Sequence, residues 1–242
     1  MDRAAYTSMS EQEGDHWWFV ARRAIIDSLI RSHVPLPDDA RILEAGCGTG
    51  GNLALLAAHG ALDALEYDPQ ARALAAARGI ARRVEPGMLP DAIGFGDTSY
   101  DMIALLDVLE HVDDDVGSLR ALGGRLAQGG RILLTVPAVP WLWSDHDALH
   151  HHKRRYTHER LVAVAQEAGL AVQASGYFNT LLFPLAVAQR MTHQLFRREA
   201  ALDARPAPWL NRGLERIFAA ERHLLGRLRF PIGLSLYAAL SA

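Results

Sequence analysis

ILEAGCGTGG, at residues 42–51, joins a short apolar strand to a helix through a glycine-rich turn. The strand comprises Ile42 and Leu43 and ends at Glu44, and the predicted helix covers residues 52–59. Glycine allows the backbone to turn tightly and to approach a ligand without an intervening Cβ. The stretch therefore predicts the first strand–turn–helix unit of a ligand-binding sheet.

The pattern continues outward from this unit as strands and helices that alternate over residues 41–177. Further strands are predicted at 62–65, 82–85, 100–106, 131–136 and 170–176, with helices at 69–78, 117–128 and 157–168. Gly129 and Gly130 are interpreted as the stop of the helix at 117–128. Such alternation indicates a parallel sheet with helices on both faces. An amphipathic helix at 16–33 precedes this region, helices at 185–198 and 210–228 flank a linker at 203–208, and a strand at 232–240 comes last. We predict an α/β, Rossmann-like, seven-stranded and mostly parallel sheet with an N-terminal helix and a helical insertion before the last strand.

The composition is that of a globular protein. The 242 residues are 50% hydrophobic and 22% charged, which supports a sizeable core. A net charge of −3 argues against a general nucleic-acid binder. One cysteine excludes a disulfide scaffold and a multi-cysteine zinc site. The first residues lack a secretory pattern, and we expect a cytoplasmic protein.

The glycine turn has two interpretations. Gly46-x-Gly48-x-x-Gly51, with Glu66 about 20 residues on, matches the dinucleotide fingerprint. Glu44-x-Gly46-x-Gly48-x-Gly50 matches the S-adenosylmethionine (SAM) loop instead. A single glycine motif does not decide between the two.

Three further stretches favour the second interpretation. LEYDP (65–69) resembles the acidic end of the second strand in class I SAM-dependent methyltransferases, and SYDMIALLDVLEHV (99–112) resembles their fourth-strand motif. LAQGGRILLTVPA (126–138) is similar to the motif around their fifth strand, and ILEAGCGTG (42–50) to their first motif. The resemblance implies methyl transfer, with SAM as cofactor and S-adenosylhomocysteine as product.

The resemblance also implies roles for individual residues. Backbone amides near Gly46 and Gly48 would face the methionine moiety, the Glu66 carboxylate would accept both ribose hydroxyls, and Asp107 would bound the sulfonium pocket. Many family members carry an acidic residue that holds the adenine amino group, whereas this chain has Met88, which would pack on the adenine face. The predicted cofactor residues are Glu44, Gly46, Cys47, Gly48, Gly50, Asn52, Leu53, Glu66, Tyr67, Met88, Leu89, Asp107, Val108, Trp17 and Arg22.

Three polar features also have structural interpretations. Glu44 can simply hydrogen-bond within the turn. Cys47 is interpreted as a small residue beneath the cofactor, because nothing basic adjoins it to activate a nucleophile. The acidic residues 113–115 are interpreted as a charge cluster at a helix start.

WLWSDHDALHHHKRRY, at residues 141–156, is the most unusual stretch. It is interpreted as a lid over the acceptor site; a solvated loop and a metal site are the alternatives, and we predict no metal site. On a helix His146 and His150 share a face, and with His111 they are the candidate general bases, although His111 can also be structural. Arg154 and Arg155 would grip a phosphate or carboxylate. The predicted substrate residues are Trp143, His151, Arg154, Arg155 and Tyr156.

Two segments resemble a bacterial subgroup of these methyltransferases. The first is the W-S-x-H-D…H-x-R-R-Y pattern within 143–156, and the second is HWWFVARR at 16–23. Trp17, Trp18 and Arg22 would cap the cofactor or the pocket, with Arg22 meeting the SAM carboxylate. Core packing is an equal alternative for one of the two tryptophans.

We expect one methyltransferase domain over residues 1–242. It consists of an N-terminal helical cap (1–39), a SAM-binding core (40–177 and 229–242) and an insertion (178–228) that covers the acceptor site. The expected partner is a small-molecule acceptor methylated on a hydroxyl oxygen, with an apolar or lipid-linked acceptor as one hypothesis. Peripheral membrane contact is less favoured, and the chain is expected to be a monomer or homodimer. An NAD(P)-dependent oxidoreductase and a non-catalytic SAM-binding protein are the alternative functions.

Overall fold

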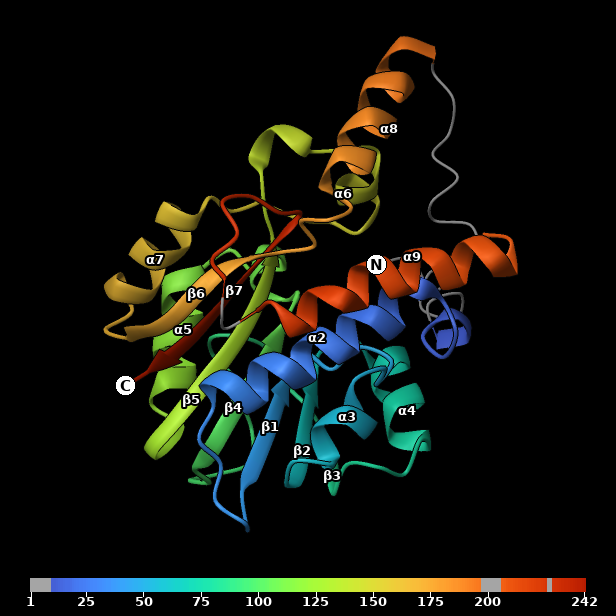
Figure 1. The fold of residues 1–242 in the computed structure, drawn as a ribbon. Coiled ribbons are helices and arrows are strands. Elements are labelled where there is room, and N and C mark those ends of the chain that lie inside the picture. The colour runs from blue at the N-terminus through green and yellow to red at the C-terminus, as the bar shows by residue number, and fades with distance from the viewer. Residues whose placement is uncertain (1–9, 197–205, 226–227) are drawn as a thin grey trace.

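The computed structural model describes residues 10–196, 206–225 and 228–242. Its seven strands form one sheet in the order β3-β2-β1-β4-β5-β7-β6 (Figure 1). The strands are β1 (Arg41–Ala45), β2 (Ala61–Glu66), β3 (Arg83–Pro86), β4 (Tyr100–Leu106), β5 (Leu126–Pro137), β6 (Ala171–Phe178) and β7 (Ser235–Ser241). β7 runs antiparallel to both β5 and β6, and the other pairings are parallel. The predicted Rossmann-like, mostly parallel sheet is therefore confirmed.

Helices cover both faces of the sheet because its central strands are apolar on both sides. In β1, Leu43 packs into the core on one face and Ile42 into the core on the other, as expected from the two-residue period of a strand. α5 (Asp115–Gly123) and α7 (His158–Glu167) pack on the first face. The second face carries α2 (Trp17–His33), α3 (Leu53–Ala57), α4 (Pro69–Ala77) and α9 (Pro208–Ala220).

The N-terminal helix and the second helix of the insertion form a pair. α2 and α9 lie side by side across the sheet (Figure 1). The Trp17 amide donates to Asn211 Oδ1 at 2.9 Å, and the Trp17 ring meets Phe218 edge-on at 6.2 Å. α9 therefore belongs to the layer that covers the sheet face, through Leu214 and Phe218, rather than to a cover over the strand ends.

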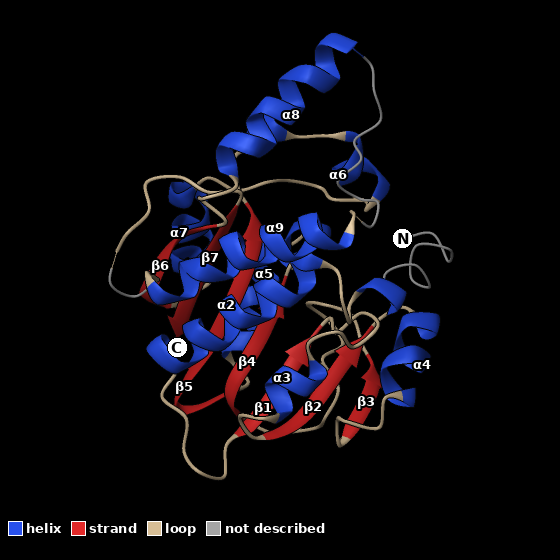
Figure 2. Ribbon diagram, turned by 45° about the vertical axis from the view of Figure 1, so that its right-hand side comes forward, coloured by secondary structure: helices blue, strands red, loops and turns tan. Residues whose placement is uncertain are grey.

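α8 (Phe183–Phe196) is the part of the insertion that stands at the carboxyl ends of the strands. It follows β6 and projects away from the sheet (Figure 2). α6 (Asp145–Leu149) lies in the segment that follows β5. Among the described residues, none of the helices combines the length and the apolar character that crossing a bilayer requires.

Several element boundaries differ from those predicted. The helix predicted over 117–128 is α5, which ends at Gly123, and β5 begins at Leu126. Gly129 and Gly130 were interpreted as the stop of that helix. They lie instead within β5, where the register of β5 against β4 shifts. A Cβ on Gly130 would lie 2.8 Å from the Tyr100 carbonyl oxygen, so this close approach requires glycine.

The second helix of the insertion, α9, is shorter than the apolar pattern predicts. α9 ends at Ala220 instead of continuing to 228, and the 3₁₀ turn η3 (Glu221–His223) follows. The buried Glu221 carboxylate accepts a 2.7 Å hydrogen bond from the Leu181 amide, which fixes this turn against the start of the insertion. The part of the predicted linker at 203–205 lies outside the described residues.

Candidate functional site

The glycine turn after β1 has the backbone conformation that its sequence requires. Gly46, Gly48 and Gly50 have φ angles of +80°, +55° and +89°. A Cβ on Gly46 would lie 2.6 Å from Val108 Cγ2, so the strand end also needs a residue without a side chain. The turn thus brings bare backbone to the carboxyl edge of the sheet, beside the residue that follows Asp107.

The amides of this turn are bonded within the protein. The Gly46 and Cys47 amides donate to the Leu65 carbonyl oxygen at 2.8 and 2.9 Å. The Gly48 amide donates to Glu66 Oε2 at 2.8 Å. These three amides hold the end of β1 to the end of β2, and the contact of this turn with the methionine moiety stays a prediction.

Glu66 is fixed by the backbone at the end of β2. Its Oε2 accepts from the Gly48 amide and its Oε1 from the Asp68 amide, both at 2.8 Å. A carboxylate has about four lone-pair sites, so two acceptor positions remain for a diol. Burial raises the pKa of Glu66. Tyr67, next along the chain, is exposed.

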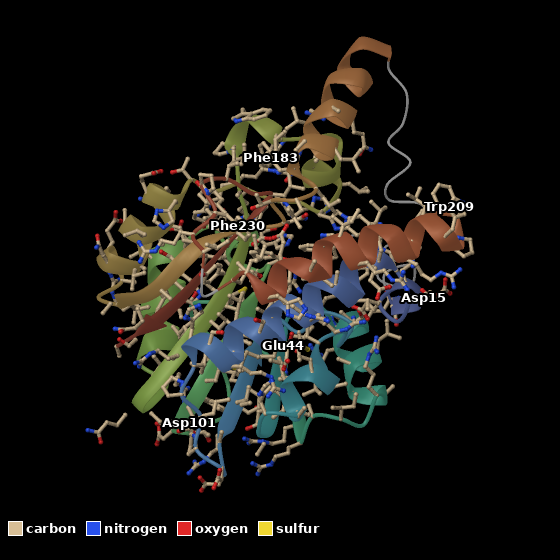
Figure 3. The ribbon with its side chains drawn as sticks, in the orientation of Figure 1. Asp15, Glu44, Asp101, Phe183, Trp209 and Phe230 are labelled. Carbon is tan, nitrogen blue, oxygen red and sulfur yellow. The ribbon has the colours of Figure 1, made fainter. Side chains whose placement is uncertain are left out.

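Glu44 is a buried carboxyl group at the end of β1 (Figure 3). Asn52 Nδ2 donates to its Oε1 at 3.0 Å, while Oε2 has no hydrogen-bond partner within the described residues. Burial raises the pKa of Glu44 to about 8. Glu44 therefore does hydrogen-bond near the turn, as its structural interpretation expects, but through one oxygen only. The second oxygen remains for a ligand.

Arg22 reaches from α2 to the carboxyl ends of β4 and β5. Its Nη2 lies 2.7 Å from Asp107 Oδ2 and 3.0 Å from Thr135 Oγ1, and its guanidinium stacks 5.2 Å from the Trp18 ring. Asp107 has a φ of +56°, a conformation that aspartate tolerates better than most residues, and Thr135 donates to its Oδ1 at 3.0 Å. Arg22 Nε is buried and has no partner within the described residues.

Glu13 is a site residue that sequence reasoning missed. It lies in the segment before α2, is buried, and accepts a 2.6 Å hydrogen bond from Thr49 Oγ1. Arg78 Nη2 lies 2.5 Å from Glu13 Oε2, and Arg78 Nε donates to the Thr49 carbonyl at 2.7 Å. These contacts brace the glycine turn from its outer side, and no sequence motif signals them. An open groove of about 510 Å³ lies here, lined by Glu13, Gly14, Arg23, Ala24, Asp27, Gly51, Ala54, Leu55 and Arg78.

The other predicted cofactor residues have mixed environments. Trp17 and Leu53 are buried in the core between the sheet and α2, which favours packing roles. Cys47 is buried and burial raises its pKa, which disfavours the thiolate form that a nucleophile needs. Met88 is 47% exposed, which leaves its side chain accessible to a flat ring. Leu89 and Val108 are partly buried against the core on the other face of the sheet, which α5 and α7 cover.

The histidine-rich segment is organised by Asp147, on α6. Its carboxylate is fully buried and accepts two hydrogen bonds from Arg155, each 2.8 Å, and two from Ser144, at 2.8 and 2.9 Å. His152 Nδ1 lies 2.9 Å from Asp147 Oδ1. Although burial raises it, the bonds from His152 and Arg155 hold the pKa of Asp147 below its usual range. The guanidinium of Arg155, predicted to grip the acceptor, is thus already paired.

Arg154 and Tyr156 are also directed at the protein itself. Arg154 Nη1 lies 3.0 Å from Asp115 Oδ2, and the fully buried Tyr156 donates its hydroxyl to the same oxygen at 3.0 Å. Asp114 caps α5 by accepting from the Gly117 amide at 2.7 Å, as the predicted charge cluster requires. These contacts give Arg154, Arg155 and Tyr156 positions that hold the segment against the strand ends. Trp143 is 37% exposed and His151 is exposed, so both remain accessible to an acceptor.

Three histidines gather beside the end of β4. The ring centroids of His111 and His152 lie 4.7 Å apart, and those of His150 and His152 lie 6.1 Å apart. Burial, and then the neighbouring His152, lower the pKa of His111 to about 4. The side chain of His146 lies outside the described residues. Two of the three predicted candidate bases are therefore near one another, together with His152, which was not predicted.

The comparison with family models decides the class of protein. A methyltransferase domain model matches residues 17–175. The chain belongs to this methyltransferase domain family. The cofactor prediction is confirmed at the level of the family: it is S-adenosylmethionine, and the dinucleotide interpretation of the glycine turn is not favoured.

Solved structures agree on the fold of this methyltransferase. It is similar, at 18% identity and a TM-score of 0.63, to the methyltransferase complexed with the Haloferax volcanii Trm112 methyltransferase activator, over 99% of this chain and 95% of that one. It is also similar to a TehB-like SAM-dependent methyltransferase from Corynebacterium glutamicum, with 19% identity, a TM-score of 0.52 and coverage of 92% and 86%. The O-methyltransferase NcsB1, from neocarzinostatin biosynthesis, has 24% identity and a TM-score of 0.51 over 71% of this chain and 53% of its own. A sequence search of curated proteins finds no match.

Proposed function

We propose that this methyltransferase moves the methyl group of SAM to a hydroxyl oxygen of a small-molecule acceptor, with His150 as general base. The assignment of SAM as cofactor rests on two buried polar atoms, one a hydrogen-bond donor and the other a carboxyl oxygen. Arg22 Nε and Glu44 Oε2 have no partner within the described residues, and each lies on a side chain that reaches the carboxyl edge of the sheet.

This pair fits the two ends of an α-amino acid. A buried polar atom without a partner is costly, so a ligand that satisfies both atoms is strongly favoured. The Arg22 guanidinium would hold the carboxylate of the methionine moiety and Glu44 its ammonium group. An NAD cofactor has no such group to place there, which supports SAM over the dinucleotide alternative.

The remaining cofactor contacts follow from the neighbouring strands. Glu66 keeps two acceptor positions for the ribose hydroxyls, and Met88 presents an accessible apolar side chain for the adenine face. Asp107 stays paired with Arg22 and thereby fixes the guanidinium. When bound, SAM supplies an electrophilic methyl group, so the protein has to position the acceptor and accept its proton.

Proton removal falls to the histidine cluster. An efficient general base has a pKa near the working pH, and the lowered pKa of His111 makes it a weak base. His150 lies beside His152 at the same edge, and we assign it as the base because, among the predicted candidates with a described side chain, it is the one other than His111. As the acceptor oxygen bonds to the methyl carbon, the sulfur–methyl bond breaks with its electron pair left on sulfur, and the hydroxyl proton passes to His150.

The acceptor would lie between α8 and the histidine-rich segment. Trp141 meets Phe183 edge-on at 6.4 Å, and Arg190 of α8 donates to the Trp143 carbonyl oxygen. Leu149, Leu181 and Leu185 expose apolar side chains in this part of the chain. These groups support an apolar acceptor. NcsB1, an O-methyltransferase whose structure was solved in complex with 1,4-dihydroxy-2-naphthoic acid, is an example of this fold with a hydroxylated aromatic bound.

The test is methyl transfer from labelled SAM to a panel of phenolic and aliphatic alcohols. We expect labelled ether product with at least one acceptor, and His150→Asn should lower kcat by ~10²-fold or more while SAM affinity stays within about twofold. The exposed His223→Asn is the matched control and should keep wild-type turnover. Methylation of amines only, or full turnover by His150→Asn, would overturn the oxygen and base assignments respectively.

A further inference from the structure

We propose that Glu110, His111 and His152 form a binding site for a divalent transition-metal ion of the zinc, iron or manganese type. One ligand atom from each of these residues lies within 4.8 Å of the other two. Two imidazoles and one carboxylate form the donor set that such ions use in proteins, with open positions left for water or substrate.

The first argument is the environment of Glu110. It lies in the 3₁₀ turn η1 (Leu109–His111) directly after β4, and it is fully buried. Neither of its carboxylate oxygens has a hydrogen-bond partner within the described residues. A buried carboxyl group with two unpartnered oxygens requires an explanation, and a bound cation between it and two histidines provides one.

The second argument is the orientation of the histidines. His152 is held through Nδ1 by Asp147 at 2.9 Å, and a ring held in this way presents Nε2 as its ligand atom. Asp147 is in turn fixed by Arg155 and Ser144. His111 makes a hydrogen bond to the backbone of His151, which orients its ring in the same manner. A carboxylate or carbonyl behind each metal-binding imidazole is the usual arrangement around protein-bound zinc.

The third argument is how the loop is attached. The Lys153 amide donates to the Glu110 carbonyl oxygen at 2.7 Å, which ties the histidine-rich segment to the turn that carries Glu110 and His111. The ligand set is thus assembled from two segments about 40 residues apart that the fold fastens together. Metal–ligand distances of about 2.0–2.1 Å place the ligand atoms of a tetrahedral site about 3.3 Å apart, so atoms as much as 4.8 Å apart have to approach one another by up to about 1.5 Å when a metal binds.

The site also suggests a role, which rests on the proposed function. The cluster lies at the end of β4, three residues after Asp107. A cation there would bind the acceptor hydroxyl and polarise it before His150 removes the proton. Glu110, His111 and His152 would then select acceptors that present an oxygen ligand to the metal.

The test is zinc binding by calorimetry to tag-free, chelator-treated full-length protein. We expect one Zn²⁺ per chain with a micromolar or lower Kd, and at least 100-fold weaker binding of Mg²⁺, which prefers oxygen ligands. Glu110→Gln and His152→Asn should each weaken zinc binding at least tenfold, and Asp147→Asn about tenfold.

The control is the exposed His223→Asn, which removes a histidine outside the cluster and should leave the zinc affinity unchanged. Circular dichroism and urea unfolding of each variant separate loss of the site from loss of the fold. The proposal would be overturned if the wild type did not bind zinc, if Glu110→Gln left the zinc affinity unchanged, or if His223→Asn lowered it as much as Glu110→Gln does. Methyl transfer by chelated wild-type protein would remove the catalytic role of the metal while leaving the methyltransferase function standing.

Discussion

Glu44→Gln should make the protein more stable and a poorer binder of SAM. The Glu44 carboxyl is fully buried, and its pKa is raised from 4.5 to about 8 by burial. As the pH rises above 4.5, the unfolded chain releases this proton while the folded chain retains it. The raised pKa therefore costs stability progressively between about pH 4.5 and pH 8.

The size of the effect follows from that interval. Each pKa unit corresponds to about 1.36 kcal/mol, so the 2.5 units between 4.5 and pH 7 cost about 3 kcal/mol. Glutamine keeps an oxygen for the Asn52 bond and never ionises. We expect Glu44→Gln to match the wild type near pH 4 and to exceed its free energy of unfolding by about 3 kcal/mol at pH 7.

The assay is urea unfolding at pH 4, 5, 6, 7 and 8, paired with SAM titration at pH 7. Glu167→Gln, an exposed change on α7, is the matched control and should stay within about 0.5 kcal/mol of wild type throughout. SAM should bind Glu44→Gln at least tenfold more weakly, because a carboxyl group can release its proton when the ammonium group binds and form an ion pair with it, whereas an amide cannot. A stability difference that does not change with pH, or full SAM affinity in the variant, would refute the reasoning.

Three further predictions concern the same edge of the sheet. Gly46→Ala adds a Cβ 2.6 Å from Val108 Cγ2 at a φ of +80°, and should lower the free energy of unfolding by about 2–5 kcal/mol in urea. Adding Val108→Ala should recover the part of this loss that comes from the steric contact, and strictly additive effects in the double mutant would contradict that contact. Arg22→Met should weaken SAM binding by ~10–100-fold in calorimetry, and equal affinity would remove Arg22 from the site. Glu13→Gln should weaken the brace on the glycine turn and raise hydrogen exchange at Thr49 and Gly51 at least severalfold, whereas unchanged exchange would show the brace to be incidental.

The sequence was sufficient for the architecture because periodicity and glycine placement encode it locally. The strand–helix alternation, the glycine turn and the acidic ends of β1, β2 and β4 all follow from patterns a few residues long. The Gly129-Gly130 pair was misassigned because a helix stop and a strand bulge share the same glycine signal. Only the approach of the Tyr100 carbonyl, from a neighbouring strand, distinguishes the two.

The site was less predictable because its contacts join distant segments. Arg155 was expected to face the acceptor, and its pairing with Asp147 depends on how the loop folds back. Ser144 and Asp147 are spaced as S-x-x-D and are hydrogen-bonded to each other, a local pattern that could have indicated the role of Asp147. The approach of His111 to His152 depends on tertiary structure, since 41 positions separate them.

The central claim is that the glycine turn binds SAM together with the buried side chains of Arg22 and Glu44. Calorimetric titration of the wild-type protein with SAM, S-adenosylhomocysteine and NAD tests it most directly. The account predicts one site per chain for both sulfur compounds and no measurable binding of NAD. Binding of NAD without binding of SAM would contradict it.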